Sequence, residues 1–233
     1  MLGVLEKVAR RLRKRRTRGI RFEPTALEGY YSQFGQDKWI AERLLPGLRD
    51  GVFVDIGAYD GVKFSNTLFL ETKLGWNGIA IEPVPEVFER LKTNRHCITV
   101  NGCVGSPPGG RKFGRVRGNL EMLSGLIAEY DPQHEARISR DLAKEGGSIE
   151  VIDVDCFEFN ELLDRHGIKH VDYLTVDVEG GEGSIIRSID FSRFEISVIG
   201  IENNYGDDAN RKYLSKRGYK FHSRVGDDFF VAT

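Results

Sequence analysis

The sequence predicts an α/β fold built on a mostly parallel sheet. After residue 50, apolar runs of strand length alternate with segments of helical periodicity, as in proteins assembled from strand–helix–strand crossovers. The run Val52–Ile56 is followed by a turn between Gly57 and Gly61, where the missing Cβ lets a ligand approach the backbone. A second run, 78–81, ends in Glu82, 21 residues after Gly61, at the spacing of an acid that binds a ribose. We therefore expect a nucleotide-binding domain.

The first half of the chain contains three of the expected strands. We predict strands over 52–56, 78–82 and 98–104, and helices over 66–74 and 85–95. Pro85 opens the second of these helices in the first turn, where its missing N–H has no partner to lose. Two prolines and five glycines predict an irregular loop over 105–118, the kind of segment in which functional residues often lie.

The second half is expected to complete a sheet of six or seven strands. Residues 119–150 are polar and weakly periodic, so we predict a partly mobile segment that could cover the substrate. The remaining signals predict strands over 149–154, 171–176 and 196–201, helices over 156–165, 183–189 and 208–217, and a terminal hairpin over 219–225 and 229–232. Gly226 and Asp227 supply its turn.

Composition limits the class of protein. A chain of 233 residues with 40% hydrophobic residues can form one substantial core. The three cysteines, Cys97, Cys103 and Cys156, have no C-x-x-C spacing, so neither a zinc knuckle nor a disulfide framework is indicated, and a cytoplasmic location is expected. No run reaches the roughly 18 apolar residues of a membrane span, and no secretory signal begins the chain. We expect a soluble or peripheral protein.

Charge is distributed unevenly along the chain. The net charge is -1, yet residues 1–21 contain nine basic side chains and one acid, so they carry +8 and the remainder carries -9. Leu2, Leu5, Val8, Ala9 and Leu12 recur at helical spacing. The segment is predicted either as an amphipathic helix that contacts an anionic membrane at its inner, cytoplasmic face or as a solvated tail. Nucleic acid is not expected, because the acidic remainder would repel phosphate.

Carboxylates follow four of the predicted strands, and they favour a cationic ligand. Asp55, Glu82, Asp177 and Glu202 lie at or just after strand ends, along the edge where open α/β sheets bind ligands. A dinucleotide would place its pyrophosphate over the first turn, where Asp55 would repel it, and the G-x-G-x-x-G pattern is absent. S-adenosylmethionine carries a sulfonium and an ammonium instead, which Asp55 and Asp60 would attract.

Four ordered blocks resemble the FkbM-type S-adenosylmethionine-dependent methyltransferases. They read SQFGQDKWI at 32–40, VFVDIGAYDG at 52–61 followed by SNT at 65–67, GWNGIAIEP at 75–83 and TVDVEGGE at 175–182. The resemblance covers Tyr31 to the C-terminus and implies a class I methyltransferase, with a Rossmann-like, seven-stranded, mostly parallel sheet, an antiparallel last strand and helices on both faces. We accordingly divide the chain into a basic segment, 1–30, and one methyltransferase domain, 31–233, with a variable insert at about 105–150.

The resemblance also assigns cofactor-binding residues. Those expected to contact S-adenosylmethionine are Gln36, Asp55, Gly57, Ala58, Tyr59, Asp60, Gly61, Asn66, Glu82, Pro83, Asn101, Cys103, Val104 and Asp177. Within this set Glu82 is expected to bind the ribose, while Asn101, Cys103 and Val104 flank the adenine. Ser65, Asn66 and Thr67 have helix capping as their alternative role.

Methyl transfer to a hydroxyl needs a base or a cation near the acceptor. The candidate catalytic residues are Asp177, Glu202, Glu179 and His222, with the first two preferred. Asp177, Glu202 and Asn203 could together bind a divalent cation such as magnesium, although we favour the alternative that Glu179, Glu182 and Glu202 only orient the substrate or cap helices.

The function expected from sequence is O-methylation of a hydroxyl on a sugar or glycan precursor. A polyketide-type natural product is the alternative acceptor. Two other classes stay open: an NAD-dependent oxidoreductase and a nucleotide-binding module without catalysis.

Overall fold

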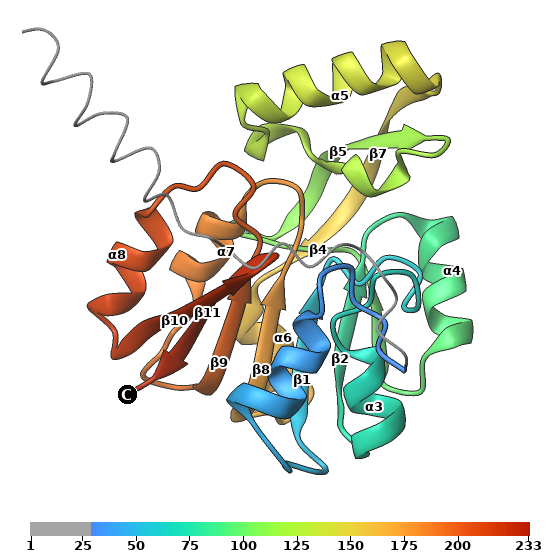
Figure 1. The fold of residues 1–233 in the computed structure, drawn as a ribbon. Coiled ribbons are helices and arrows are strands. Elements are labelled where there is room, and N and C mark those ends of the chain that lie inside the picture. The colour runs from blue at the N-terminus through green and yellow to red at the C-terminus, as the bar shows by residue number, and fades with distance from the viewer. Residues whose placement is uncertain (1–28) are drawn as a thin grey trace, which may run out of the picture.

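The computed structural model describes residues 29–233, so the basic segment predicted over 1–21 lies outside the described residues. The chain forms an α/β fold with two sheets, one of seven strands and one of four (Figure 1). No helix among the described residues has the length and apolar character needed to cross a membrane.

The larger sheet is mixed: six of its strands run in one direction, and one strand next to an edge runs antiparallel to them. Its order is β10-β11-β9-β8-β1-β2-β3. The strands are β1 (Val52–Ile56), β2 (Asn77–Glu82), β3 (Ile98–Asn101), β8 (His170–Val176), β9 (Glu195–Ile201), β10 (Tyr219–Val225) and β11 (Asp227–Ala232). Strand β11 runs antiparallel to both β9 and β10. The predictions for β1, β2, β8, β9 and the hairpin are confirmed to within two residues.

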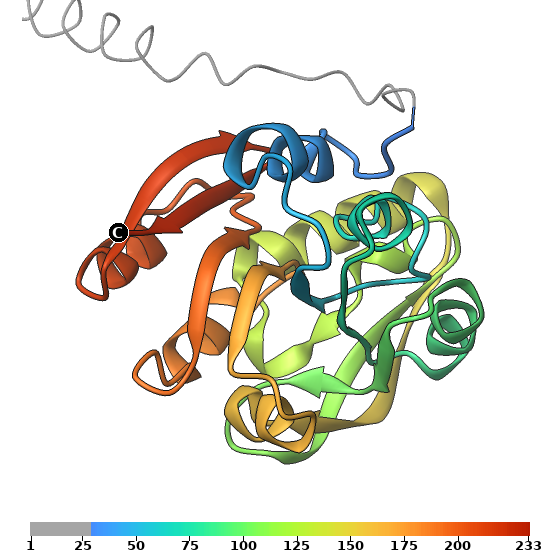
Figure 2. The ribbon, with the colours of Figure 1, turned by 90° about the horizontal axis from the view of Figure 1, so that it is seen from below.

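Helices cover both faces of this sheet (Figure 2). One face packs against α2 (Gln36–Trp39), the π-helix Ile40–Leu44, α3 (Leu68–Leu74) and α4 (Pro85–Asn94). The other packs against α6 (Phe159–Arg165), α7 (Glu182–Ser188) and α8 (Ala209–Ser215). Strand β1 is buried from both sides: Val54 and Ile56 point into one core and Phe53 into the other, which explains its unbroken apolar run.

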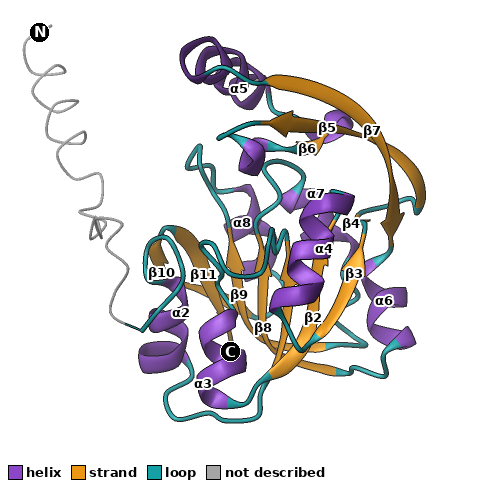
Figure 3. Cartoon of the chain, turned by 90° about the vertical axis from the view of Figure 1, so that its right-hand side faces the viewer, coloured by secondary structure: helices purple, strands orange, loops and turns teal. Residues whose placement is uncertain are grey.

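The second sheet lies beyond one end of the first and includes most of residues 103–157 (Figure 3). Its order is β4-β7-β5-β6, with β4 (Cys103–Val104), β5 (Gly109–Arg117), β6 (Gly125–Leu126) and β7 (Ser148–Phe157). The 3₁₀-turns Glu121–Leu123 and Ile127–Glu129 and helix α5 (Pro132–Glu145) complete it. Val116, Leu123 and Ile138 form a small core between α5 and this sheet.

The structure differs from the sequence-based expectation at three places in this region. The expected loop over 105–118 contains the nine-residue strand β5, which pairs with β7 from Gly109↔Cys156 to Arg117↔Ser148. Residues 119–150 contain the 14-residue helix α5, whose cap Asp131 accepts a hydrogen bond from the backbone N–H of Gln133 at 2.7 Å. The helix expected from 156 begins at Phe159, because Cys156 and Phe157 still belong to β7.

The strand expected over 98–104 is also divided, because the chain changes sheets at Gly102. This glycine has φ 153°, and a Cβ there would lie 2.7 Å from the carbonyl oxygen of Asp155. Strand β3 therefore stays in the large sheet and β4 enters the small one. The residues expected near the adenine thus lie at the junction between the two sheets.

Candidate functional site

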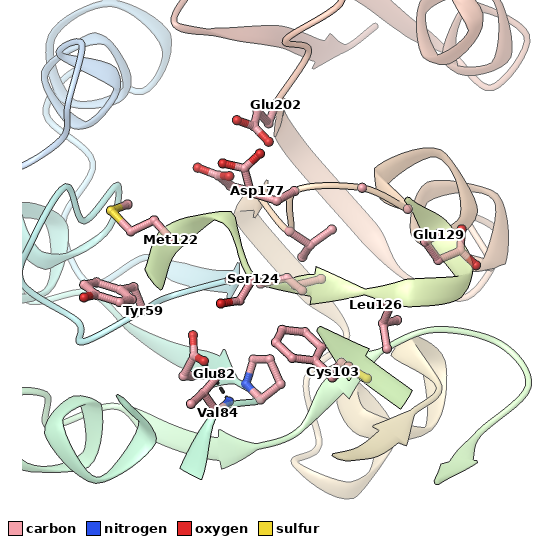
Figure 4. Close-up of a pocket in the computed structure, with 18 of the residues that line it drawn as sticks. Tyr59, Glu82, Val84, Cys103, Met122, Ser124, Leu126, Glu129, Asp177 and Glu202 are labelled. Carbon is pink, nitrogen blue, oxygen red and sulfur yellow. Dashed lines mark hydrogen bonds between the residues drawn. The ribbon is translucent and has the colours of Figure 1, made fainter. Parts of the chain in front are cut away.

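A cavity of about 210 Å³ lies between the carboxyl ends of the large sheet and the small sheet (Figure 4). The large sheet contributes Gly57 after β1, Glu82 at the end of β2, Asp177 after β8 and Glu202 after β9. The small sheet and its turns contribute Cys103, Val104, Phe113, Arg115, Glu121, Met122, Ser124, Leu126, Glu129 and Arg137. Three of the four carboxylates expected at aligned strand ends, Glu82, Asp177 and Glu202, therefore do converge on one cavity.

Backbone hydrogen bonds between neighbouring strands keep the residues that follow these strands side by side. The ladder continues past the strands, since the N–H of Asp177 donates to Ile56 O at 3.0 Å and that of Glu202 to Val176 O at 3.0 Å. Gly57 has φ 93°, and a Cβ there would lie 1.7 Å from the carbonyl oxygen of Asp177. The turn after β1 can therefore reach this position only as glycine.

Glu82 presents a buried carboxylate to the cavity. Its side chain is 6% exposed, and one oxygen accepts a hydrogen bond from the N–H of Val84 at 2.8 Å. Burial raises the pKa of Glu82 to about 7. Nearby, the hydroxyl of Tyr59 donates to Glu121 at 2.9 Å, which links the turn after β1 to the small sheet. Glu82 therefore retains free acceptor capacity on the cavity side.

A smaller pocket adjoins the cavity and contains more of the predicted residues. Gly57, Tyr59 and Asp177 line both spaces, while Gln36, Asp55, Ala58 and Asn66 line only the smaller one. Asp55 accepts a hydrogen bond from Thr67 Oγ1 at 2.5 Å and lies 4.0 Å from Arg95. The oxygen Oδ1 of Asn66 is buried without a hydrogen-bond partner, so it is an acceptor that a ligand N–H could satisfy.

The part of the cavity beside the ends of β8 and β9 is acidic. Burial and the charge of Glu182 raise the pKa of Asp177 to about 6, and burial together with Asp177 raises that of Glu179 to about 8. Burial and Asp177 also raise the pKa of Glu202, whose carboxyl hydrogen-bonds to Asp177. Arg137 of α5 lies 3.2 Å from Glu179 and is the nearby cation. At neutral pH, Glu179 with its pKa of about 8 therefore holds a proton, whereas Asp177 with its pKa of about 6 carries the negative charge that would favour a cationic ligand.

Four predicted residues lie outside both pockets. Asp60 accepts hydrogen bonds from the N–H groups of Val62 and Lys63, and therefore stabilises the turn. Gly61 packs toward Leu91 and Arg95, whereas Asn101 Nδ2 donates to the carbonyl of Glu82 at 2.9 Å. His222 is exposed on β10, near Trp39. These four residues gain no support from the geometry as ligand or catalytic groups.

The sequence interpretation missed the contribution of the small sheet. Arg115, Glu121, Met122, Ser124 and Arg137 all line the cavity and come from the segment expected to be loop or mobile. The Asp131-Pro132 cap of α5 was a readable helix signal. For β5 no comparable signal existed, because glycine and charged residues alternate with its few apolar positions.

Among residues 29–233, no three His, Cys, Asp or Glu side chains are grouped to hold a metal ion. Asn203, expected beside Glu202, donates instead to Asp228 at 2.8 Å. The proposed divalent-cation site gains no support from this arrangement.

The fold is that of an α/β protein with a cavity at the carboxyl ends of its parallel strands, beside the point between β1 and β8 where strand order reverses, which is the usual ligand-binding position in such sheets. The family model described as "Methyltransferase FkbM domain" matches residues 55–221, well over half of the chain. The chain therefore belongs to the FkbM methyltransferase family. Comparison with curated proteins and with solved structures finds no match.

Proposed function

We propose that this protein transfers a methyl group from S-adenosylmethionine to a hydroxyl group, with a sugar or glycan precursor as the acceptor. The observation that carries the proposal is the pairing of a buried, free carboxylate at the end of β2 with an unpartnered acceptor, Asn66 Oδ1, in an acidic space at the end of β1. The first fits a ribose diol and the second fits an ammonium. The strand order, with β11 antiparallel between β9 and β10, supports a class I methyltransferase topology.

The cofactor would supply an electrophilic methyl carbon on a positively charged sulfur. Glu82 would accept hydrogen bonds from the ribose hydroxyls, and Pro83, Cys103 and Val104 would flank the adenine. Asn66, Gln36 and the backbone at Gly57 would hold the methionyl part. The lining of the larger cavity fits this ligand because it is rich in acceptors and because its two arginines, Arg115 and Arg137, are paired with Glu86 and Glu179, which also argues against the pyrophosphate of NAD.

Asp177 is our candidate base. Its pKa of about 6 leaves it ionised at neutral pH, and burial together with the charge of Asp177 raises the pKa of the neighbouring Glu202. A hydroxyl within reach of Asp177 could pass its proton to this carboxylate as the methyl group arrives. Glu179 and Arg137 would orient the acceptor from the side of α5.

The acceptor class is supported by family resemblance and by the polar wall of Ser124, Glu129, Arg137, Ser184 and Asn204 around the open end of the cavity. A polyketide-type hydroxyl is the alternative acceptor.

Calorimetry tests the cofactor, and mass spectrometry tests the acceptor. We expect S-adenosylmethionine to bind and NAD not to bind. In glycan extracts treated with protein and cofactor, we expect products heavier by one methylene group together with S-adenosylhomocysteine. Cofactor binding without that product, in glycan and polyketide panels alike, would instead indicate a binding module without catalysis.

A further inference from the structure

Two cysteines lie side by side in the wall of the cavity. Cys103 of β4 and Cys156 of β7 are register partners in a parallel pairing, and both are reduced and buried. Neighbouring strands lie about 4.8 Å apart, and a disulfide spans Cα separations of roughly 4.4–6.8 Å. Partners in register also direct their side chains to the same face of a sheet. The two sulfurs are therefore placed for a bond that needs no rearrangement of the strands.

The cavity reaches one cysteine of the pair directly and passes beside the other. Cys103 lines it directly. Gly105 lines it as well, and a Cβ on Gly105 would lie only 3.0 Å from the sulfur of Cys156. The sulfur of Cys156 is therefore separated from the cavity by Gly105, which has no side chain to block an approach from that side.

The environment of the pair favours one thiolate. Cys103 donates to the carbonyl oxygen of Asp155 at 3.5 Å and lies within hydrogen-bonding reach of Cys156. This contact, with the charge of Arg111 nearby, lowers the pKa of Cys156, while it raises that of Cys103. Thiolates rather than thiols attack peroxides, so the direction of these shifts makes Cys156 the expected site of the first attack and Cys103 the expected resolving partner.

We propose that Cys103 and Cys156 are a redox-active dithiol that a hydroperoxide, entering through the cavity, converts to a reversible disulfide. The Cys156 thiolate attacks one peroxide oxygen, the O–O bond breaks, and the other oxygen leaves as water after taking a proton. The sulfur of Cys103 then attacks the sulfenic acid on Cys156, the S–S bond forms, and the second oxygen leaves as water. Two thiols and one hydrogen peroxide give one disulfide and two waters, and a dithiol reductant reverses the oxidation.

Hydrogen peroxide added to the purified full chain tests this dithiol, with intact mass and peptide mapping under non-reducing conditions as readouts. We expect the loss of two hydrogen atoms, restored by dithiothreitol, and one cross-linked peptide pair containing Cys103 and Cys156. Cys103→Ser and Cys156→Ser should each prevent this loss. Cys97→Ser is the matched control, since Cys97 is also buried but belongs to another core cluster, and it should leave the disulfide unchanged.

Gly105→Ala tests the route of entry. It should slow disulfide formation several-fold, because its methyl group would cover the sulfur of Cys156, and its backbone is not in the left-handed region. A wild-type chain that keeps three free thiols after peroxide treatment overturns the proposal. So does a disulfide that includes Cys97, or direct conversion of Cys156 to sulfinic acid.

Discussion

At the scale of single residues, burial at adjacent strand ends raises the pKa of both Asp177 and Glu202. Asp177→Asn should lower kcat by a factor of about 10²–10⁴, the usual contribution of a general base. In the wild type, kcat should rise with pH through about 6, where Asp177 loses its proton, and the variant should lack this rise. Steady-state rates between pH 5 and 8 measure both effects.

The matched control is Glu195→Gln, at the amino end of the same strand as Glu202 and largely exposed. It should retain the rate and the pH profile. Unchanged kcat in Asp177→Asn would remove this carboxylate from proton transfer.

The same burial predicts how stability depends on pH without cofactor. Burial raises the pKa of Glu82 to about 7 and that of Glu179 to about 8, from ordinary values of 4.5. The folded protein therefore binds more protons than the unfolded chain between about pH 4.5 and 8, so the free energy of unfolding falls as pH rises through this range. Glu82 alone contributes on the order of 3 kcal/mol. Urea denaturation at pH 5, 6, 7 and 8 measures the slope.

Glu82→Gln should flatten this slope between pH 5 and 7, because its side chain does not titrate. Glu89→Gln, an exposed substitution on α4, should keep the wild-type slope. Parallel curves for wild type and Glu82→Gln would contradict the assignment of a buried, protonated carboxyl at this position.

At the scale of elements, the turn after β1 depends on Gly57. Gly57→Ala combines a left-handed backbone, φ 93°, with a Cβ 1.7 Å from the carbonyl of Asp177. We expect a loss of about 3 kcal/mol or more in the free energy of unfolding, from strain and overpacking together. Gly47→Ala isolates the backbone contribution, because Gly47 has φ 78° with nothing within 4 Å of its Cβ. It should cost only about 1–2 kcal/mol. Equal losses in the two variants would mean that the close approach to Asp177 is not a constraint.

The sequence predicted those elements whose burial can be recognised from a local run of apolar residues. Strands 52–56 and 171–176 are buried on both faces, so they read as continuous apolar runs and placed Asp55 and Asp177 at the correct edge. Strand β5 is different, since its pairing with β7 joins residues 31 to 47 positions apart and its glycines resemble a loop. Gly114, for instance, is needed because the hydroxyl of Tyr130 would lie 2.5 Å from its Cβ. This contact with Tyr130 exists only in the folded protein, so nothing in the local sequence explains the glycine. The part of the site that β5 forms could therefore not be predicted from the sequence.

At the scale of the whole molecule, the two parts of the chain carry opposite net charges. Residues 22–233 carry -9 and include the acidic cavity, which suits a cationic cofactor and repels anionic ligands. Residues 1–21 carry +8, which suits an anionic surface. We propose that this segment brings the enzyme to anionic lipid, where a lipid-linked glycan acceptor would be concentrated.

The last prediction follows from that charge. The full chain should co-sediment with vesicles containing phosphatidylserine, since each basic residue near such a surface contributes about 1 kcal/mol, and added salt should weaken the binding. Deletion of residues 1–21 should abolish sedimentation and leave S-adenosylmethionine affinity unchanged. Substituting Leu2, Leu5 and Leu12 with Ala retains the charge and removes apolar surface, so intermediate binding would indicate an amphipathic helix rather than charge alone. Neutral vesicles are the control surface. Sedimentation that survives the deletion would contradict the role of this segment.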